Sequence, residues 1–147
     1  MTRLTNEECV RRYAAASAAH DLEALPTLRH PEWMVSWPQS GEIVHGSQAF
    51  AEIITNYPGG APAVEVTRII GAEDQWVVTP ANTAIRVAGS GDFWWSEWRV
   101  TYPDGATYLC VDLMELRDGR IWRETVYWAS PFEAPTWRSP WVERGPV

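Results

Sequence analysis

Residues 108–128, YLCVDLMELRDGRIWRETVYW, constrain the fold more than any other part of the chain. Two runs of aromatic and aliphatic side chains flank an Asp-Gly dipeptide, which is the pattern of a β-hairpin with a tight turn. Near the middle of the first run, Asp112 stands between Val111 and Leu113. An ionised carboxylate buried there without a partner costs free energy, so Asp112 is the first candidate for a functional residue.

Helices precede this hairpin and strands dominate from residue 64 onward. Thr5 and Glu8 form the capping box of a first helix, Asp21 caps a shorter second helix, and Ser47 caps a third over 48–56. Strands are expected over residues 33–37, 43–44, 64–71, 75–88, 92–102, 106–116 and 120–128. Helices first and a long meander afterwards predict an α+β domain, with the helices on one face of a curved antiparallel sheet.

The chain of 147 residues is long enough for one domain with a core of its own. We expect that domain to span 1–128 and to be followed by a proline-rich tail over 129–147. The prolines predict an extended tail with little regular structure. Phe132, Trp137 and Trp141 are spaced along it like anchors, so the tail is expected to pack on its own domain or on a partner subunit.

Composition excludes several functions. The formal net charge of −7 argues against binding nucleic acid, and all 12 basic residues are arginine, which excludes a Schiff base on lysine. The three histidines lack metal-ligand spacing, so neither a metal nor a cofactor is expected. No segment suits a membrane span or a signal peptide, so the expected location is the cytoplasm. The 10 tryptophans favour a lined cavity or an interface over simple core filling.

A three-residue loop over 103–105 is expected to close an earlier hairpin, because Asp-Gly there suits a type I turn followed by a left-handed glycine. Counting back along both strands sets Ser96 opposite Asp112 and Trp98 opposite Cys110, and cross-strand partners share a face. Both faces of the resulting sheet are substantially apolar. We therefore expect helices to cover one face and a second subunit to cover the other, which gives a homodimer through the outer sheet face.

The turn at residues 117–119 leaves two registers open. A two-residue Asp-Gly turn sets Asp112 opposite Thr125 and places Tyr127 on the face of Asp112. A three-residue loop sets Asp112 opposite Glu124 instead, which brings two carboxyl groups together and raises the pKa of one of them. The one-residue difference exchanges the two faces of the whole strand.

Four stretches together resemble the nuclear-transport-factor-2-like superfamily and, within it, the SnoaL-like proteins. They are RRYAAASAAHDLEAL in the region of the first helix, WPQSGE, GSQAFAEII and the closing MELRDGRIWRETVYW. The resemblance covers nearly the whole chain and implies a cone, in which a strongly bent sheet wraps around helices and leaves a pocket. It also implies a dimer through the outer sheet face, whereas activities vary widely among proteins with this fold.

Branches of the superfamily imply roles for individual residues. In the ketosteroid-isomerase branch, an oxyanion hole joins a tyrosine on the first helix to a carboxylic acid on a late strand, and Tyr13 and Asp112 resemble these two groups. Trp37, before Pro38, stands where that branch has its general base, so the resemblance does not extend to its steroid mechanism. SnoaL-like cyclases use an aspartate placed like Asp112 as acid/base, usually with a histidine on the sheet. Limonene-epoxide-hydrolase relatives use an Asp–Arg–Asp set, whose second aspartate is not evident here.

Two arrangements of Asp112 follow from the sequence. In the first, its carboxyl lies in an aromatic cavity, desolvation raises its pKa, and it acts as acid and base. In the second, Asp112 is neutralised by Arg86, Arg99 or Arg123, or bonded by the hydroxyl of Ser96 or Thr125. We favour the first arrangement. The predicted catalytic residues are Asp112 and Tyr13, and the predicted substrate-binding residues are Trp33, Trp37, Trp98, Tyr108 and Tyr127.

The sequence therefore predicts a cofactor-independent isomerase, cyclase or hydratase that acts on a polyketide, terpenoid or aromatic metabolite. Tyr13 would donate a hydrogen bond to a developing oxyanion, and the tryptophans would shape the pocket. Two alternatives belong to other classes of protein. The chain would be a binding protein with the same cavity and no turnover, or a dimeric structural module whose pocket is packed shut.

Overall fold

The computed structural model describes residues 3–72, 75–78, 80–81, 84–87 and 91–146. Its helices are α1 (Asn6–Ala18), α2 (Ala24–Leu28), α3 (Gly46–Thr55) and the 3-10 helix η1 (Thr136–Trp141). Its strands are β1 (Arg29–Trp37), β2 (Glu42–His45), β3 (Ala63–Ala72), β4 (Gln75–Val78), β5 (Ala84–Val87), β6 (Phe93–Thr101), β7 (Thr107–Arg117) and β8 (Arg120–Ala129).

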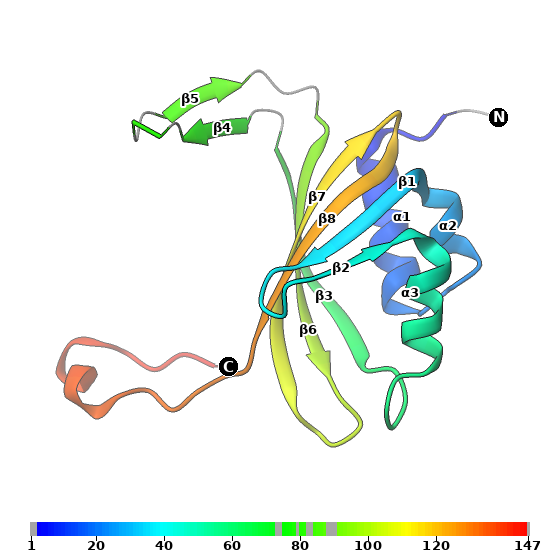
Figure 1. The fold of residues 1–147 in the computed structure, drawn as a ribbon. Coiled ribbons are helices and arrows are strands. Elements are labelled where there is room, and N and C mark those ends of the chain that lie inside the picture. Colours follow the sequence, from blue (N-terminus) through cyan, green and yellow to red (C-terminus); the bar gives the residue numbers. More distant parts are fainter. Residues whose placement is uncertain (1–2, 73–74, 79, 82–83, 88–90, 147) are drawn as a thin grey trace.

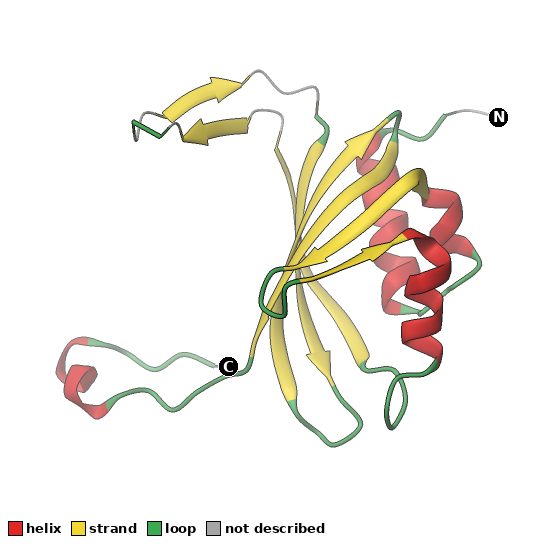
Figure 2. Ribbon diagram, in the orientation of Figure 1, coloured by secondary structure: helices red, strands yellow, loops and turns green. Residues whose placement is uncertain are grey.

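One six-stranded sheet organises the domain, in the order β2-β1-β8-β7-β6-β3. Its neighbouring strands are antiparallel except for β1, which runs parallel to β8. Helices α1, α2 and α3 lie together on one side of this bent sheet (Figure 1), and the same layering is seen when the ribbon is coloured by secondary structure (Figure 2). The predicted α+β cone is confirmed.

Two of the three predicted helix caps are observed, and the third, Ser47, is wrong, because α3 already begins at Gly46 and has no side-chain cap. At the start of α1, the Thr5 hydroxyl accepts from the Glu8 N–H at 3.1 Å, and the Glu8 carboxylate accepts from the Thr5 N–H at 2.8 Å, which confirms the capping box. Asp21 accepts hydrogen bonds from the backbone N–H groups of Glu23 and Ala24, where α2 begins. These bonds satisfy backbone donors that the first turn of a helix leaves free.

The core lies between the helices and the inner face of the sheet. The buried face of α1 meets side chains from β1, β2, β7 and β8. The main members of this cluster are Cys9, Val10, Tyr13, Ala16, Leu25, Trp33, Val35, Val44, Met114, Leu116 and Ile121. Removing this apolar surface from water is what holds the helices against the sheet. None of the helices within the described residues is long and apolar enough to cross a membrane.

The first hairpin has the predicted register. Tyr102 and Ala106 are joined by a backbone hydrogen bond of 2.8 Å, and Gly105 has a φ of +87°, as a left-handed turn position requires. Ser96 pairs with Asp112. The face of the sheet that carries Asp112 is therefore the face predicted from the turn.

The second hairpin has the predicted two-residue turn, but neither predicted register holds at Asp112. Arg117 pairs with Arg120, so the turn has two residues, but the register shifts by one residue between Glu115 and Leu116. Trp122 is the extra residue of this β-bulge. Beyond the bulge Asp112 pairs with Val126, and not with Thr125 or Glu124 as the two predictions had it. A bulge exchanges the faces of the strand that follows it.

The region predicted as one strand over 75–88 is divided. Residues 75–78 and 84–87 form two short strands, β4 and β5, which pair antiparallel in a sheet of their own. The single long strand is therefore wrong for the described part of this region. Residues 79, 82, 83 and 88 lie outside the described residues.

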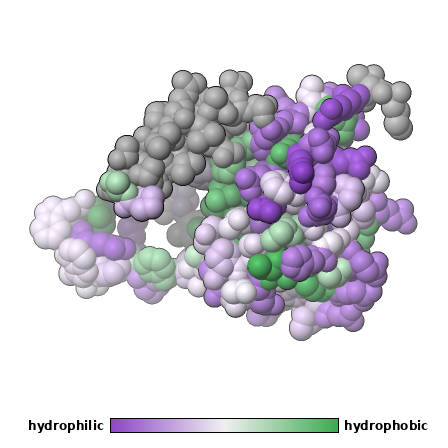
Figure 3. All heavy atoms as spheres, turned by 45° about the horizontal axis from the view of Figure 1, so that its top comes forward, coloured by the Kyte–Doolittle hydropathy of each residue, from purple (hydrophilic) through white to green (hydrophobic). Residues whose placement is uncertain are grey.

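The tail after β8 stands away from the helices and the core. It is extended except for η1, a short helix that the proline content did not predict. Phe132, Trp137 and Trp141 are 81%, 72% and 77% exposed. In the space-filling view, mostly hydrophilic residues cover the helical side of the molecule, and the tail projects beyond the body (Figure 3). The expected packing of the tail on its own domain or on a partner subunit stays a prediction.

Candidate active site

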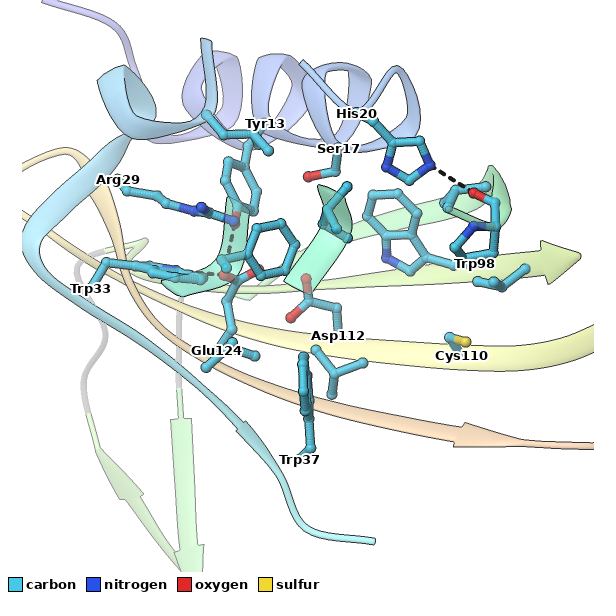
Figure 4. Close-up of a pocket in the computed structure, with 18 residues that line it drawn as sticks. Tyr13, Ser17, His20, Arg29, Trp33, Trp37, Trp98, Cys110, Asp112 and Glu124 are labelled. Carbon is cyan, nitrogen blue, oxygen red and sulfur yellow. Dashed lines mark hydrogen bonds between the residues drawn. The ribbon is translucent and has the colours of Figure 1, made fainter. Parts of the chain in front are cut away.

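A cavity opens between the inner face of the sheet and helices α1 and α3. It encloses about 190 Å³, and a second chamber of about 330 Å³ adjoins it. Residues that line both chambers are Trp37, Phe50, Ile54, Pro62, Val100, Cys110 and Val126. This lining is apolar, as in sites that bind small molecules by burying them. The polar groups are concentrated in the inner chamber, where Arg29, Asp112 and Glu124 lie (Figure 4).

Asp112 is almost completely buried, with 5% of its surface exposed, and its carboxyl group points into the cavity (Figure 4). Its Oδ1 has no hydrogen-bond partner among the described residues. Burial raises the pKa of this carboxyl well above its ordinary value, the charge of Glu124 and a hydrogen bond with Glu124 raise it further, and Arg29 opposes the rise. Asp112 therefore holds a proton at pH values where a solvated aspartate is ionised.

Two of the three arginine partners predicted for Asp112 lie elsewhere. Arg99 lies opposite Leu109 on the outer face of the sheet, and the exposed Arg123 has its guanidinium carbon 4.1 Å from the ring of Trp122. The side chain of Arg86 lies outside the described part of the structure. On the inner face the Ser96 hydroxyl accepts a hydrogen bond from an indole N–H at 2.5 Å. Among the described residues, the acid is thus housed by cavity walls and not by an ion pair.

Glu124 is the second carboxyl group of the site. It is also 5% exposed, and its Oε2 accepts hydrogen bonds from the Tyr13 hydroxyl at 2.8 Å and from the Trp33 Nε1 at 2.6 Å. Glu124 faces the cavity because the bulge at Trp122 turns this part of β8 inward. Two donors directed at one oxygen form the arrangement expected of a buried carboxylate, which needs its hydrogen bonds when water is excluded.

Arg29 completes the network at the start of β1. Only 3% of its surface is exposed, and its Nε donates to the Tyr13 hydroxyl at 2.8 Å while its Nη1 lies 3.3 Å from the Ser47 hydroxyl. The guanidinium carbon lies 3.6 Å from the centre of the Trp33 ring and 4.5 Å from that of Phe50. Aromatic faces replace part of the hydration that this cation loses on burial.

Tyr13 therefore connects a buried cation to a buried carboxyl group. Its hydroxyl accepts from Arg29 and donates its hydrogen to Glu124. Burial, and next the charge of Glu124, raise the pKa of Tyr13 well above its ordinary value, so this hydroxyl keeps its proton. Because that hydrogen is directed to Glu124, Tyr13 acts on the cavity through the carboxyl group rather than by pointing its own O–H into it.

His20 enters the site through an unusual helix end. Its backbone φ of +50° and the hydrogen bonds His20 N–H to Ser17 and Asp21 N–H to Ala16 form a Schellman motif, whose left-handed position normally holds glycine. A larger residue costs free energy there. The ring of His20 lines the cavity and its Nε2 lies 2.6 Å from the Pro62 carbonyl oxygen (Figure 4). The motif thus places the imidazole of His20 in the wall of the cavity.

Five of the predicted site residues meet at this cavity and two do not. Asp112, Tyr13, Trp33, Trp37 and Trp98 line the inner chamber. Tyr108 does not line either chamber and lies at the start of β7, with its ring 5.2 Å from that of Tyr102. Tyr127 pairs with Val111 and is 45% exposed on the outer face, because the bulge reverses the strand that carries it.

Arg29, Glu124 and His20 contribute to the site but were not selected from the sequence. Glu124 could be predicted as a site residue, since one of the two open registers placed it opposite Asp112. The His20 signal was present as well, because His20-Asp21 follows a long alanine-rich helix and ends it without glycine. Arg29 gave no signal, because a charged residue before His-Pro at a strand start is ordinarily solvated. Within the described residues, no three His, Cys, Asp or Glu side chains group as a metal site requires.

Comparison with known proteins identifies the class to which this fold and cavity belong. An NTF-2 like protein of unknown function from Burkholderia xenovorans LB400 has 32% sequence identity and a TM-score of 0.73, over 96% of this chain and 95% of that one. A candidate ketosteroid isomerase from Kribbella flavida DSM 17836 has 22% identity and a TM-score of 0.74, over 97% and 90% of the two chains. These similarities define a nuclear-transport-factor-2-like fold.

The family follows from the sequence itself. The model of the SnoaL-like domain matches residues 10–124, so the chain belongs to the SnoaL-like family. This match confirms the resemblance drawn from the sequence motifs. Among curated proteins, no match to the chain is found. The family supports an isomerase-type function on a small molecule and leaves the reaction and the substrate to be argued from the site.

Proposed function

We propose that the protein is a cofactor-independent acid/base enzyme that isomerises, cyclises or hydrates an apolar metabolite of polyketide, terpenoid or aromatic type. The observation that carries this proposal is Asp112, a protonatable carboxyl group with an oxygen that has no partner among the described residues, buried in a cavity with mostly apolar walls. An unpartnered polar atom in such a place costs free energy in the empty protein, and a ligand that supplies the missing partner recovers it.

The proposed proton transfers use both carboxyl groups. One proton is held between Asp112 and Glu124, and the free Oδ1 of Asp112 accepts a second proton from an acidic carbon of the substrate. The shared proton then moves fully to Glu124, and the electron pair of the broken C–H bond passes to the substrate oxygen as an enolate. Asp112 returns its proton to a different atom of the substrate, and the proton on Glu124 moves back between the carboxyl groups.

The other residues support this transfer in the proposal. Tyr13 and Trp33 hold Glu124 in place by hydrogen bonds to one oxygen, so that the remainder of the carboxyl group faces Asp112. Arg29 supplies positive charge beside the two carboxyl groups and so offsets the negative charge of the site. Trp37 and Trp98 form walls that exclude water and orient a flat ligand.

Hydrogen exchange at carbon tests the proposal without knowledge of the natural substrate. A panel of small apolar ketones and enones is incubated with the protein in deuterated water, and loss of carbon-bound hydrogen is followed by NMR. We expect Asp112→Asn to lower the exchange rate by about 10²–10⁴-fold, the usual contribution of a general acid/base. Binding, measured by quenching of tryptophan fluorescence, should stay within a few fold of the wild type.

Asp104→Asn is the matched control, because Asp104 lies in the exposed turn of the first hairpin and its Oδ1 accepts a backbone hydrogen bond that asparagine also accepts. This variant should exchange the panel at the wild-type rate. If the wild-type protein binds members of the panel but exchanges none of them, the chain is a binding protein. If it binds none of them, the proposal of an open ligand site fails.

A further inference from the structure

The side of the cavity formed by α1 carries two polar side chains that the proposed proton transfers do not use. Ser17 lies one turn after Tyr13 on the same face of α1, and His20 follows at the C-terminal end of the helix. Both residues line the inner chamber. In the close-up, the Ser17 hydroxyl and the His20 ring project from α1 toward the sheet that carries Asp112 (Figure 4). The cavity therefore has polar groups on two opposite walls.

The hydrogen bond between His20 and Pro62 determines which ring nitrogen of His20 is free. The Pro62 carbonyl oxygen can only accept, so Nε2, which lies 2.6 Å away, carries the hydrogen. In the neutral ring, Nδ1 then has an unshared electron pair and acts only as an acceptor. Within the described residues, neither Nδ1 nor the Ser17 hydroxyl makes a hydrogen bond. This wall of the cavity thus offers one acceptor and one hydroxyl group that can donate.

The backbone conformation of His20 points to a use for its side chain. Its φ of +50° is left-handed, and glycine adopts such a conformation at lower cost. Glycine would end α1 equally well, because the two hydrogen bonds of the Schellman motif use backbone atoms alone. A strained residue that the local structure does not require is a feature of functional sites. The imidazole is therefore the part of His20 that this position needs.

We propose that Ser17 and His20 bind a hydroxyl group of the ligand, which donates to His20 Nδ1 and accepts from the Ser17 hydroxyl. This inference rests on the proposed function and narrows the substrate to a hydroxylated apolar ketone, with its acidic carbon at Asp112 and its hydroxyl group at α1. A second carbonyl group does not fit, because it cannot donate to Nδ1. An ammonium group would donate, but the buried Arg29 in the same chamber repels a second cation.

Paired ligands measure this contact. The flat apolar ketone β-tetralone is compared with its ring-hydroxylated analogues at pH 8, where an ordinary imidazole is neutral, by quenching of tryptophan fluorescence. We expect at least one analogue to bind about tenfold more tightly than β-tetralone, the gain from two neutral hydrogen bonds. His20→Gly and Ser17→Ala should each reduce this preference to about threefold or less and leave the affinity for β-tetralone within about twofold of the wild type. Both variants suit their backbone positions, since glycine favours the left-handed conformation and alanine favours the helix.

Asp118→Gly is the matched control for the backbone change, because Asp118 has a φ of +53° and does not line either chamber. This variant should keep the full preference. If His20 only holds the loop that contains Pro62, then His20→Gly weakens the binding of β-tetralone and of its analogues by the same factor, and the inference is overturned. A wild-type protein that binds β-tetralone without preferring any hydroxylated analogue also overturns it.

Hydrogen exchange at carbon, measured on the same compounds, separates this inference from the proposed function. Exchange without a preference for a hydroxylated analogue leaves the acid/base function standing and removes only the contact with Ser17 and His20. A clear preference without exchange establishes the contact in a binding protein and removes the acid/base function. If the wild type binds neither β-tetralone nor any analogue, both proposals fail.

Discussion

The two faces of the sheet shift the pKa of a carboxyl group in opposite directions. On the outer face of the sheet, Arg68 of β3 donates two hydrogen bonds to Glu97 of β6, at 2.9 and 2.7 Å, and these bonds lower the pKa of that carboxyl group. On the inner face of the next strand, burial raises the pKa of Asp112. Both residues are carboxylic acids on neighbouring antiparallel strands. Access to water decides which one is a screened surface ion and which one stores a proton.

The arginines of the two faces differ in the same manner. Arg68 is more than half exposed and its ion pair with Glu97 is solvated, whereas Arg29 is enclosed by aromatic rings and reaches Glu124 only through Tyr13. A solvated pair contributes little to stability, because water and salt compete for both charges. A buried network is costly to assemble and costly to break. Mutations that remove one member should therefore separate the two faces clearly.

The largest effect is expected for Glu124→Ala. The substitution leaves the Tyr13 hydroxyl and the Trp33 indole without their acceptor and removes the carboxyl group to which Tyr13 connects the buried Arg29. Breaking a buried charged network in this way costs about 3–5 kcal/mol in the free energy of unfolding, measured by urea denaturation followed by tryptophan fluorescence. The matched control is Glu97→Ala on the outer face, which should unfold close to the wild type. Equal losses for the two variants would contradict the distinction between the faces.

An intermediate, pH-dependent effect is expected for Asp112→Asn. Between the pKa of Asp112 in the unfolded chain, about 3.9, and its raised value in the folded protein, the folded state holds a proton that the unfolded state has lost. The free energy of unfolding of the wild type therefore falls as pH rises through this window. The variant does not titrate at this position, so its stability relative to the wild type should rise with pH above about 4. Parallel pH profiles for the two proteins would show that Asp112 is solvated.

The smallest effect is expected for Glu97→Gln. A lowered pKa contributes stability above the unfolded value and loses it as pH falls, which is the opposite sign to Asp112. Because both Glu97 and Arg68 are solvated, salt screens this contribution. Thermal unfolding at physiological ionic strength should not distinguish the variant from the wild type at any pH. A clear drop in the unfolding temperature would contradict the solvation of this ion pair.

Local signals predicted most of the fold. The Thr5–Glu8 capping box and the loop over 103–105 each depend on residues close together in the chain, and both have the expected geometry. Asp112 was selected because a carboxyl group in an apolar strand is conspicuous by itself. These features required no knowledge of what lies across the core, which is why the sequence was sufficient for them.

Features that depend on distant contacts were not predictable. No residue pattern in the hairpin sequence predicts the bulge at Trp122, although the bulge determines that Glu124 and not Tyr127 faces the cavity. Arg29 is buried because the Trp33 ring of its own strand and the rings of Tyr13 and Phe50, from two helices, surround it, and the sequence near Arg29 does not indicate the two distant rings.

The bulge at Trp122 also limits how function can be transferred between relatives of this chain. A homologue that lacks the extra residue would present the neighbours of Glu124 to its cavity, even though an alignment would place the two hairpins in nearly identical columns. Matching active-site residues by counting from the Asp-Gly turn would then assign to the cavity the side chains that point away from it. The dependable reference point is the far end of β8, past the insertion, where pairing with Asp112 fixes which side chains point inward.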